Sequence, residues 1–474
     1  MGAAASATLR ATAPWRVLDG FGYAVRAACR FARPESIEEL AETIATARAE
    51  GLGVTFRGAG RSYGDAALNR DGLVVDLTNL RRIYSWDPGA GVIDAEAGLT
   101  IEGLWRHTIE DGYWPAVVPG TMFPTLGGCL SMNIHGKNNH QVGPFGEHVR
   151  DFDLLTADGS VLLCSRDENA DLFQAAVGGM GLLGAVTRVK LALKRVYSGS
   201  LRVEPILGRN LDELIDIFEA RLGASDYLVG WVDCFASGPS LGRGAVHAAS
   251  YLGEGQDPYP RETLRVDNQG IPPRILGFPR DHVWRLMRPF TNDAGVALVN
   301  YGKFLSSHLE HGRPYRQSHV QFAFLLDYVA NWRRAYGRAG FVQHQIFVPQ
   351  AAARSCLRDV LAICQRLGFR SYLGVLKRHR PDPFLMTHAL DGYSLAMDFP
   401  ARDGEKLAAA AGAVTARVLD AGGKFYFAKD ALIGPEDAVR AYGQETLDRF
   451  SALRRRLDPD GIFTSALARR VLGG

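Results

Sequence analysis

A glycine-rich segment early in the chain carries groups that bind anions. The sequence GAGRSYGD, residues 58–65, follows a strand-like run at 52–57 and precedes another at 73–77. Consecutive backbone N–H groups in such a turn can form a concave site for a phosphate without a helix, and Ser62 adds a hydroxyl donor. The same glycines also fit a plain connection between two strands. This loop alone leaves both interpretations open.

A second loop favours a cofactor. The sequence PGTMFPTLGGC, residues 119–129, is followed closely by NIHGKN, residues 133–138, so that His, Lys and Asn side chains accompany small residues and hydroxyls. Together the two loops predict a site that grips the two phosphates and the isoalloxazine of a flavin.

A third glycine motif, GMGLLG at residues 179–184, matches the dinucleotide fingerprint in letters only. That fingerprint needs a strand before it and a helix after it. Here a helix-like run at 171–177 comes first and a strand-like run at 185–193 follows. The reversed order argues against a Rossmann site.

Helices and strands must position these loops, and the pattern predicts a mixed α and β chain. Ser36 and Glu39 form a capping box for a helix that ends before Gly51. Further helical patterns lie at 101–110, 170–177, 210–222, 351–367 and 436–457, and strand patterns lie at 92–97, 154–157, 185–193, 227–233, 245–251, 341–348, 372–376 and 393–399. The stretch 252–296 is rich in Pro and charge-balanced, which predicts an irregular lid or surface loop.

Composition narrows the class of protein. The chain has 474 residues, of which 47% are hydrophobic and 22% charged, and this predicts a folded protein of two to three domains. A net charge of only +3 argues against a strong field that would draw nucleic acid or an anionic membrane. The six cysteines have no close C-x-x-C spacing, so we expect free thiols, and no His, Cys or carboxylate cluster has the spacing of a metal site. The chain shows no secretory signal and no apolar run of membrane-spanning length, which predicts a soluble cytoplasmic protein.

Several segments together resemble a known family. They are RGAGRSYGD (57–65), PTLGG (124–128), IHGKN (134–138), FGEH (145–148), DLLTADG (153–159), AYG (335–337), FVQHQ (341–345), AKD (428–430) and the ending at 466–470. The chain is identified by them as a member of the vanillyl-alcohol-oxidase superfamily, which has the PCMH-type FAD-binding domain. Within it the sequence most resembles the decaprenylphosphoryl-β-D-ribose 2′-oxidase group, over nearly the whole chain.

The resemblance implies an α+β fold of two domains, a PCMH-type FAD-binding domain and an α+β substrate domain whose antiparallel sheet lies over the flavin. The implied boundaries are 1–196 for the FAD domain, 197–422 for the substrate domain and 423–474 for a C-terminal segment that returns to the FAD domain. The implied cofactor is non-covalent FAD, because Arg61 and Phe123 replace the His and the Cys that attach FAD in other members.

The resemblance also assigns residues to the site. The implied cofactor-binding residues are Arg57, Gly58, Ala59, Gly60, Arg61, Ser62, Tyr63, Gly64, Gly120, Thr125, Leu126, Gly127, Gly128, Asn133, His135, Gly136, Val186 and Tyr426. The implied catalytic residues are Lys429, Tyr63 and His135. The implied substrate residues are Lys137, Trp231, Gln343, Gln345 and Lys377.

Each of the main residues has a plainer interpretation. His135 either orients Tyr63, stabilises negative charge on the reduced ring, or is an ordinary buried histidine. Lys429 is either a general base or a surface lysine paired with Asp430, and Trp231 is either core or a platform for a sugar. Cys129 reads as a small buried thiol.

Two positions and one segment depart from the family pattern, namely Ala396, where mycobacterial members carry a Cys, His344, and the loop at 252–296. The expected function is FAD-dependent oxidation of a primary or secondary hydroxyl on a sugar or glycosidic substrate, by hydride transfer to flavin N5, with a downstream reductase as a partner. The alternatives are oxidation of another sugar alcohol or an aminoglycoside-type product, a nicotinamide-fed FAD reductase, and a flavoprotein that only binds.

Overall fold

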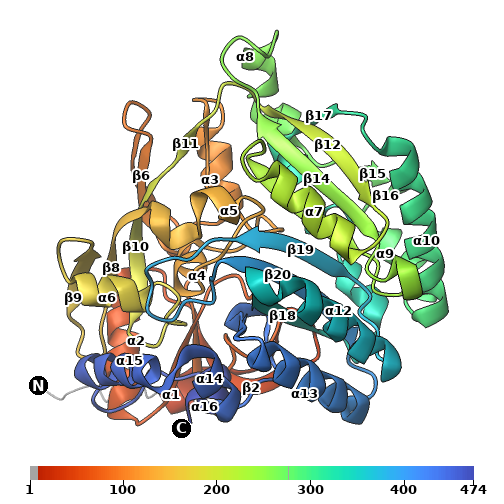
Figure 1. Ribbon diagram of the computed structural model, residues 1–474. Helices are drawn as coiled ribbons and strands as arrows, with labels where there is room; N and C mark the ends of the chain where they lie inside the picture. The colour runs from red at the N-terminus through yellow and green to blue at the C-terminus, as the bar shows by residue number, and fades with distance from the viewer. Residues whose placement is uncertain (1–8, 276, 474) are drawn as a thin grey trace, which may run out of the picture.

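The computed structural model describes residues 9–275 and 277–473 (Figure 1). The first eight residues, which belong to the segment searched for a secretory signal, lie outside the described residues. Two sheets occupy the N-terminal half. A four-stranded sheet has the order β1-β2-β4-β3, and a five-stranded antiparallel sheet has the order β5-β6-β10-β8-β9. Their strands are β1 (Trp15–Asp19), β2 (Arg26–Ala32), β3 (Val54–Arg57), β4 (Leu73–Asp76), β5 (Ile83–Asp87), β6 (Val92–Glu96), β8 (Val149–Leu155), β9 (Val161–Ser165) and β10 (Ala185–Ala192).

The glycine loop at 58–65 lies inside a parallel connection. Strands β3 and β4 pair in parallel, with Val54 opposite Leu73. Parallel neighbours need a long crossover, and the segment between them supplies it as a loop instead of a helix. The predicted strand, glycine loop and strand are therefore confirmed.

An eight-stranded antiparallel sheet dominates the rest of the chain, with the order β17-β12-β14-β13-β19-β20-β18-β21. Its strands are β12 (Ser200–Gly208), β13 (Tyr227–Val232), β14 (Gly244–Tyr251), β17 (Tyr315–Ser318), β18 (Phe341–Pro349), β19 (Gly374–His379), β20 (Gly392–Pro400) and β21 (Lys424–Phe425). The two short pairs are β7 (Tyr113–Trp114) with β11 (Lys194–Arg195) and β15 (Arg274–Ile275) with β16 (Phe278–Pro279).

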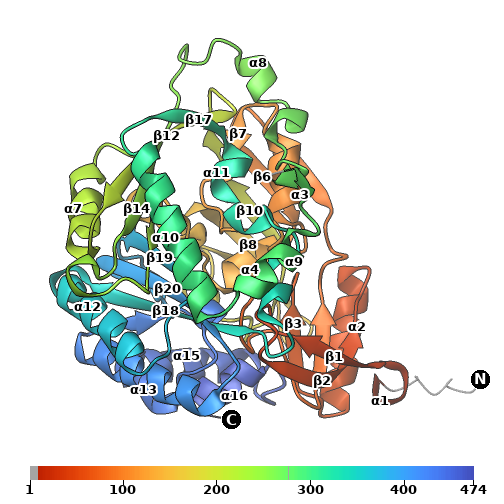
Figure 2. The same ribbon diagram turned by 90° about the vertical axis from the view of Figure 1, so that its right-hand side faces the viewer.

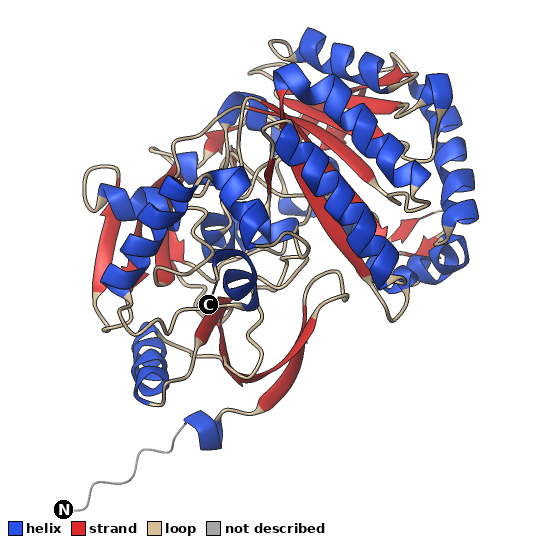
Figure 3. Cartoon of the chain, turned by 60° about the horizontal axis from the view of Figure 1, so that its bottom comes forward, coloured by secondary structure: helices blue, strands red, loops and turns tan. Residues whose placement is uncertain are grey.

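Helices cover one face of the large sheet and leave the other toward the N-terminal half (Figure 3). The covering helices are α7 (Leu211–Arg221), α12 (Gln350–Arg366) and α13 (Gly404–Asp420). The other helices are α1 (Leu9–Thr12), α2 (Ile37–Ala49), α3 (Ile101–Thr108), α4 (Leu126–Ser131), α5 (Asn139–Val142), α6 (Ala170–Ala176), α8 (Pro260–Thr263), α9 (Val283–Met287), α10 (Asp293–Glu310), α11 (His319–Ala323), α14 (Pro435–Tyr442), α15 (Gln444–Leu457) and α16 (Ala466–Leu472).

The predicted α+β class is confirmed. The predicted capping box of α2 is half formed: Ser36 Oγ accepts from Glu39 N at 3.2 Å, but the Glu39 carboxylate accepts from Glu35 N at 2.7 Å and not from Ser36 N. The prediction of one helix over 436–457 is wrong. Two helices meet at Gly443, whose φ of +83° ends the first of them, and such a conformation suits glycine. The prediction of an irregular segment at 252–296 is wrong in part, because it contains α8, α9 and the start of α10.

The end of the chain is fastened to the first glycine loop. Phe463 forms a parallel bridge with Val54 of β3. Arg470 on α16 binds Asp65 at 2.8 Å and Asp430 at 2.8 Å, and Asp430 is fully buried. The C-terminal segment therefore holds both the loop at 58–65 and the AKD segment.

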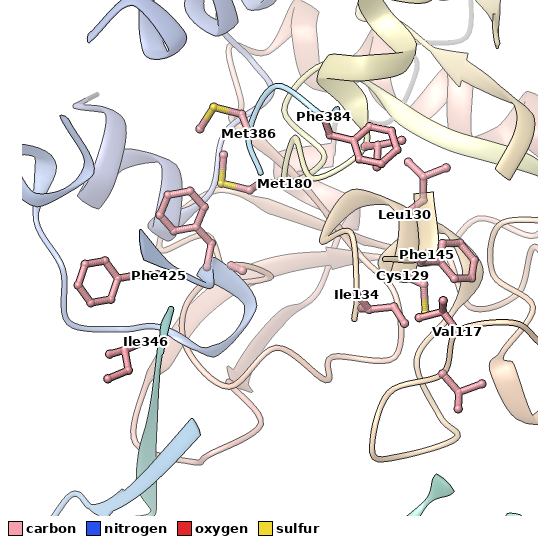
Figure 4. Packing of buried hydrophobic residues seen from close by; sticks show 14 of the residues in the cluster. Val117, Cys129, Leu130, Ile134, Phe145, Met180, Ile346, Phe384, Met386 and Phe425 are labelled. Atoms are coloured by element: carbon pink, nitrogen blue, oxygen red, sulfur yellow. The ribbon is translucent and has the colours of Figure 1, made fainter. Parts of the chain in front are cut away.

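The core packs tightly beneath α4 (Figure 4). Cys129 is fully buried there beside Leu130, Ile134 and Phe145, and burial raises the pKa of its thiol. All six cysteines are buried and free, as predicted. Among the described residues, no helix is long and apolar enough to cross a membrane.

Candidate active site

A cavity lies between the glycine loops and the open face of the large sheet, and its space, counted together with the open solvent at its mouth, is about 1220 Å³. It extends from the glycine loops to Lys377 and the AKD segment, so it suits an elongated ligand. Its lining comes from all three glycine motifs, from β19 and from the AKD segment. The lining residues are Phe56, Gly58–Tyr63, Ala66, Ala67, Leu77, Ala97, Pro119–Thr121, Pro124, Thr125, Gly127, Gly128, Ser131, Met132, Ile134, His135, Met180, Gly181, Gly184, Val186, Leu326, Lys377, Tyr426, Ala428 and Lys429.

The first glycine loop presents hydrogen-bond donors to this cavity. Within the described part of the chain, the backbone N–H groups of residues 58–62 have no acceptor, whereas Tyr63 N donates to Ala428 O at 2.8 Å. Gly60 has a φ of +62°, which bends the loop. A run of unpaired donors on a cavity wall is the arrangement that binds phosphate, so the loop fits the pyrophosphate of the expected FAD.

The second glycine loop packs directly on the first. Thr125 caps α4 by accepting from Gly128 N at 3.2 Å. A Cβ added at Gly58 would lie 2.2 Å from Thr125 Oγ1, so only glycine allows the two loops to meet. Gly127 and Gly128 leave the same wall without side chains, which lets a flat group approach the backbone.

The third glycine motif also lines the cavity, and sequence reasoning missed this. Helix α6 precedes it and β10 follows, so the exclusion of a Rossmann turn holds. Nevertheless Met180, Gly181 and Gly184 line the cavity, and Gly181 has a φ of +73°. The glycines of this motif were a signal in the sequence. Comparison with the dinucleotide fingerprint alone did not reveal that they line the cavity.

Five of the predicted cofactor residues do not line the cavity. Leu126 is core, and Gly64 lets the loop approach the backbone of Asp430. Arg57 donates to Ala67 O at 3.1 Å, and Asn133 accepts from Gly146 N at 3.0 Å. Gly136 packs on the side chain of Asn138. These groups support the loops in the described structure, and their role in binding the cofactor stays a prediction.

The two positions that attach FAD in related proteins lie together. The Arg61 guanidinium is 4.6 Å from the centre of the Phe123 ring, and burial lowers the pKa of Arg61. Neither side chain is a nucleophile that could bond to a flavin ring.

A cluster of ionisable groups closes the other end of the cavity. Lys429 lies 5.8 Å from the centre of the Tyr63 ring. Burial lowers the pKa of Lys429 to about 8, and the charge of Asp398 opposes that shift. Lys429 is therefore not a surface lysine paired with Asp430, because Asp430 binds Arg470 and lies 3.3 Å from His344 Nδ1.

Asp398 was not anticipated as a site residue. It is fully buried on β20, accepts a hydrogen bond from Gln343, and burial raises its pKa to about 7. Burial and the charge of Asp398 also raise the pKa of Tyr63 well above its ordinary value, so this tyrosine stays neutral. The alternation Ser394, Ala396, Asp398, which puts all three on one face of the strand, was a signal that could have found it.

His135 is held by a chain of hydrogen bonds from the large sheet. Gln345 Nε2 lies 2.9 Å from His135 Nε2 and 3.0 Å from Ser394 Oγ, which in turn lies 2.7 Å from His379 Nε2. Because the amide nitrogen donates, His135 Nε2 accepts, and the ring proton is on Nδ1. Burial and the charge of Lys377 lower the pKa of His135 well below its ordinary value, so the ring is neutral.

The position of His135 bears on its predicted role. In the described structure we find no hydrogen bond or ring contact between His135 and Tyr63. Instead, the Tyr63 ring packs on Phe21 and Phe341 at 5.0 and 5.6 Å. The described structure therefore gives no direct contact through which His135 would orient Tyr63, and His135 Nδ1 is buried there without a hydrogen-bond partner.

The predicted substrate residues are spread over the open face of the sheet. Lys377 lines the cavity, and burial together with Lys429 lowers its pKa well below the ordinary value. Gln343 and Gln345 contact Asp398 and His135 as described. Lys137 is buried against Phe322, whose carbonyl it binds, so it does not reach the cavity. Trp231 is nearly buried, with Lys303 Nζ 4.4 Å above its ring.

One further element covers the cavity. Leu326 lines it from the 3-10 helix η5 (Leu325–Asp327). Asp327 fastens this helix to the second glycine loop, accepting from Thr121 Oγ1 at 2.7 Å and from Met122 N at 2.8 Å. This cover was not predicted from the sequence.

The two positions that depart from the family pattern lie on opposite faces of the large sheet. Ala396 is buried on the same face of β20 as Asp398, pairs with Val375 and is not among the residues that line the cavity. His344 lies on the opposite face of β18 and stacks on Phe425 at 5.1 Å. It therefore does not alter the wall of the site.

Comparison with known proteins agrees with this geometry. Residues 29–165 match the family model described as FAD binding domain. The chain is 34% identical to decaprenylphosphoryl-β-D-ribose oxidase of Mycolicibacterium smegmatis over 426 residues, which is 89% of each chain. It is 29% identical to L-gulonolactone oxidase of Bos taurus over 41% of this chain and 43% of that protein. It is 32% identical to cytokinin dehydrogenase 3 of Arabidopsis thaliana over 34% of this chain and 32% of that protein.

Proposed function

Since this chain belongs to the family of FAD-dependent oxidoreductases that contains decaprenylphosphoryl-β-D-ribose oxidase, we propose that it oxidises a hydroxyl group on a sugar or glycosidic substrate. The relative's name describes a sugar carried on a lipid phosphate, and such a lipid-linked sugar is the form of substrate we favour. The predicted boundaries at 196 and 422 remain part of this proposal.

One observation carries the proposal, namely a half-buried lysine at the reactive end of the cavity. With a pKa of about 8, about a tenth of Lys429 is neutral at pH 7, which lies in the range that suits a general base. Lys429 takes the hydroxyl proton of the substrate. FAD, when bound, supplies the acceptor for the hydride that leaves the carbinol carbon.

The other residues of the cluster position the reacting groups. His135 presents Nδ1–H as a donor, because Gln345 occupies Nε2. Burial, followed by the charge of Lys429, lowers the pKa of Lys377. Asp398 holds a compensating negative charge. Leu326 adds an apolar side chain to the cavity wall, and such a wall helps to exclude water once a substrate fills the site.

The proposed experiment mixes the FAD-loaded protein with a panel of sugars, glycosides and glycolipids without oxygen, and follows the loss of flavin absorbance. Reduction by an alcohol substrate supports the proposal and identifies the substrate. Rapid reduction by NADPH and by none of the alcohols would assign a reductase instead. Reduction by neither would assign a binding protein. Oxidation of an aminoglycoside-type product would keep the chemistry and change the substrate.

Three further parts of the proposal go beyond the active site. We propose that FAD is held without a covalent bond, that a reductase acts on the keto or aldehyde product, and that the protein works in the cytoplasm. Cell fractionation tests the last of these.

A further inference from the structure

Helix α10 reverses the usual arrangement of an amphipathic helix. Its two buried side chains are polar, Asn300 and Ser307. Three leucines are exposed instead, with Leu298 at 62%, Leu305 at 50% and Leu309 at 71% of their surface. Each residue turns the helix by about 100°, so the leucines project from the side opposite Asn300 and Ser307. A surface helix of a globular protein normally buries such a stripe.

Polar contacts attach this helix to the body. Asn300 Nδ2 donates to Asp233 Oδ1 at 3.0 Å, and Asp233 also pairs with Arg243 at 3.0 Å. Tyr372 donates to Asp293 at 2.8 Å at the start of the helix. Because hydrogen bonds and an ion pair hold the inner side, the leucines are left free for another contact. Figure 2 shows α10 in front of the strands of the large sheet, and α10 contacts β12 and β14.

The elements that precede α10 in the chain also carry exposed apolar side chains. β16, α9, the 3-10 helix η4 (Arg288–Phe290) and α10 carry exposed large hydrophobic side chains. Together we call these side chains the outer apolar surface. These are Phe278, Leu286, Met287, Phe290, Leu298, Val299, Tyr301, Leu305 and Leu309. Isolated exposed apolar residues are normal, but a concentration on adjacent elements marks an interaction site.

Positive charge accompanies this surface. Residues 271–316 contain seven Lys or Arg and three Asp or Glu, a net charge of +4, while the whole chain has only +3. The rest of the chain is therefore nearly neutral, and the small total conceals a local excess. Five of these arginines are exposed and have no ion pair with a carboxylate in the described part of the chain, namely Arg274, Arg285, Arg288, Arg313 and Arg316.

We propose that the outer apolar surface docks on an anionic lipid bilayer, with α10 lying in the plane of the interface. Exposed leucine and aromatic side chains beside arginines are the composition of helices that lie on such membranes. Charge complementarity therefore identifies the occupant as an anionic bilayer. The preference for a bilayer over an acidic protein rests on the proposed function, since a lipid-linked sugar is held in a membrane.

The position of α10 relative to the site agrees with this proposal. Lys303 on its inner side lies over Trp231, and Trp231 pairs with Val375 in the sheet. Val375 and Lys377 point to the same face of β19, since side chains alternate along a strand. The docked helix thus borders the sheet face that leads to the cavity, and a sugar head group would pass from the bilayer to Lys377 along it.

The test is co-sedimentation of the FAD-loaded protein with vesicles. We expect binding to vesicles that contain phosphatidylglycerol with phosphatidylcholine, and weak binding to phosphatidylcholine alone. The variant L298S/L305S/L309S should bind at least about tenfold more weakly, because the inserted apolar area is lost. The variant R285Q/R288Q/R313Q should lose the preference for phosphatidylglycerol, and salt should weaken wild-type binding.

A matched control keeps the result specific. V17S/V161S/V439S removes exposed apolar side chains elsewhere and should bind as wild type does. Equal binding by the leucine variant, or no binding to either vesicle, would overturn the proposal. A wild-type dimer that the leucine variant converts to monomer, without vesicle binding, would assign the surface to a second copy.

Failure here is separable from failure of the proposed function. Vesicle binding is measured without substrate, and the leucine variant should keep its FAD and its rate of flavin reduction by a water-soluble alcohol. Loss of flavin reduction with intact vesicle binding would count against the proposed chemistry only.

Discussion

The amide of Gln345 lies 2.9 Å from Nε2 of His135, so that the large sheet determines which nitrogen of that histidine carries the proton. The two residues are far apart in the chain and meet only where β18 faces the segment after α4. The tautomer of His135 is thus a product of how the two parts of the chain pack.

This relationship predicts the effect of Gln345→Leu. Without the amide donor, His135 should populate both tautomers, and flavin reduction should slow by about three- to tenfold, as expected for one lost hydrogen bond. The ¹⁵N chemical shifts of the His135 ring check the tautomer directly. Gln141→Leu, which changes an exposed glutamine, should leave the shifts unchanged. Wild-type shifts in Gln345→Leu would contradict the assignment.

Lys429→Ala should retain FAD and the fold but reduce its flavin about 10²- to 10⁴-fold more slowly, the usual contribution of a general base. The measurement is anaerobic single-turnover reduction by an alcohol substrate, with equal FAD in both proteins. The wild-type rate should rise with pH and level off above about 8, because the neutral amine is the active form. Lys406→Ala, an exposed lysine, is the control, and a Lys429→Ala rate within about threefold of wild type would remove Lys429 from the mechanism.

Asp398→Asn should move the pH dependence of the rate of flavin reduction to lower pH. The negative charge of Asp398 raises the pKa of Lys429, so its removal lowers that pKa further. The midpoint of the rate against pH is the quantity to compare. An unchanged midpoint would show that Asp398 is protonated throughout or does not act on Lys429.

Acid precipitation should release intact FAD into the supernatant. Arg61 and Phe123 occupy the two attachment positions and pack on one another, and neither can bond to the flavin. Absorbance and mass of the supernatant identify the released cofactor. Flavin that stays with the denatured polypeptide would contradict this, and release of FMN would contradict the cofactor itself.

Arg470→Ala should lower the free energy of unfolding by about 3–5 kcal/mol at pH 7, because it leaves the buried Asp430 and Asp65 without their cation. Burial alone would raise the pKa of Asp430, but His344 and Arg470 outweigh it and hold that pKa below 3.8. The contribution of this ion pair to the stability of the folded protein is therefore fully present above pH 3.8. It is lost as pH falls through the lowered pKa of Asp430. Urea unfolding measures it. Arg469→Ala, on the same helix, should lower the free energy of unfolding much less. Equal losses in the two variants would refute the special role of Arg470.

The sequence predicted elements best where local signals were strong. The N-cap at Ser36, the strand-like run at 341–348 and the loop at 58–65 depend on neighbours in the chain, and each was found. Gly443 breaks a continuous helical pattern, and a single glycine inside such a pattern does not reveal its positive φ. Helix α10 was missed because its polar side is buried and its apolar side exposed, the opposite of the pattern that identifies a surface helix.

The site was predictable in its loops and less so in its chemistry. Tyr63, His135 and Lys429 came from resemblance, and the cavity does bring them to one wall. Asp398, Ser394 and His379 were not found, because their roles depend on strand pairings that join β18, β19 and β20 across long stretches of chain. Cys129 required no long-range information, since a small thiol in an apolar setting is usually core.

The fastening of α16 to Asp65 and of Phe463 to Val54 has a consequence for synthesis. The phosphate loop is synthesised long before Phe463 and Arg470, which brace it. A nascent chain therefore completes this loop only after residue 470 has emerged from the ribosome, and we expect a chain truncated before Phe463 to bind no flavin.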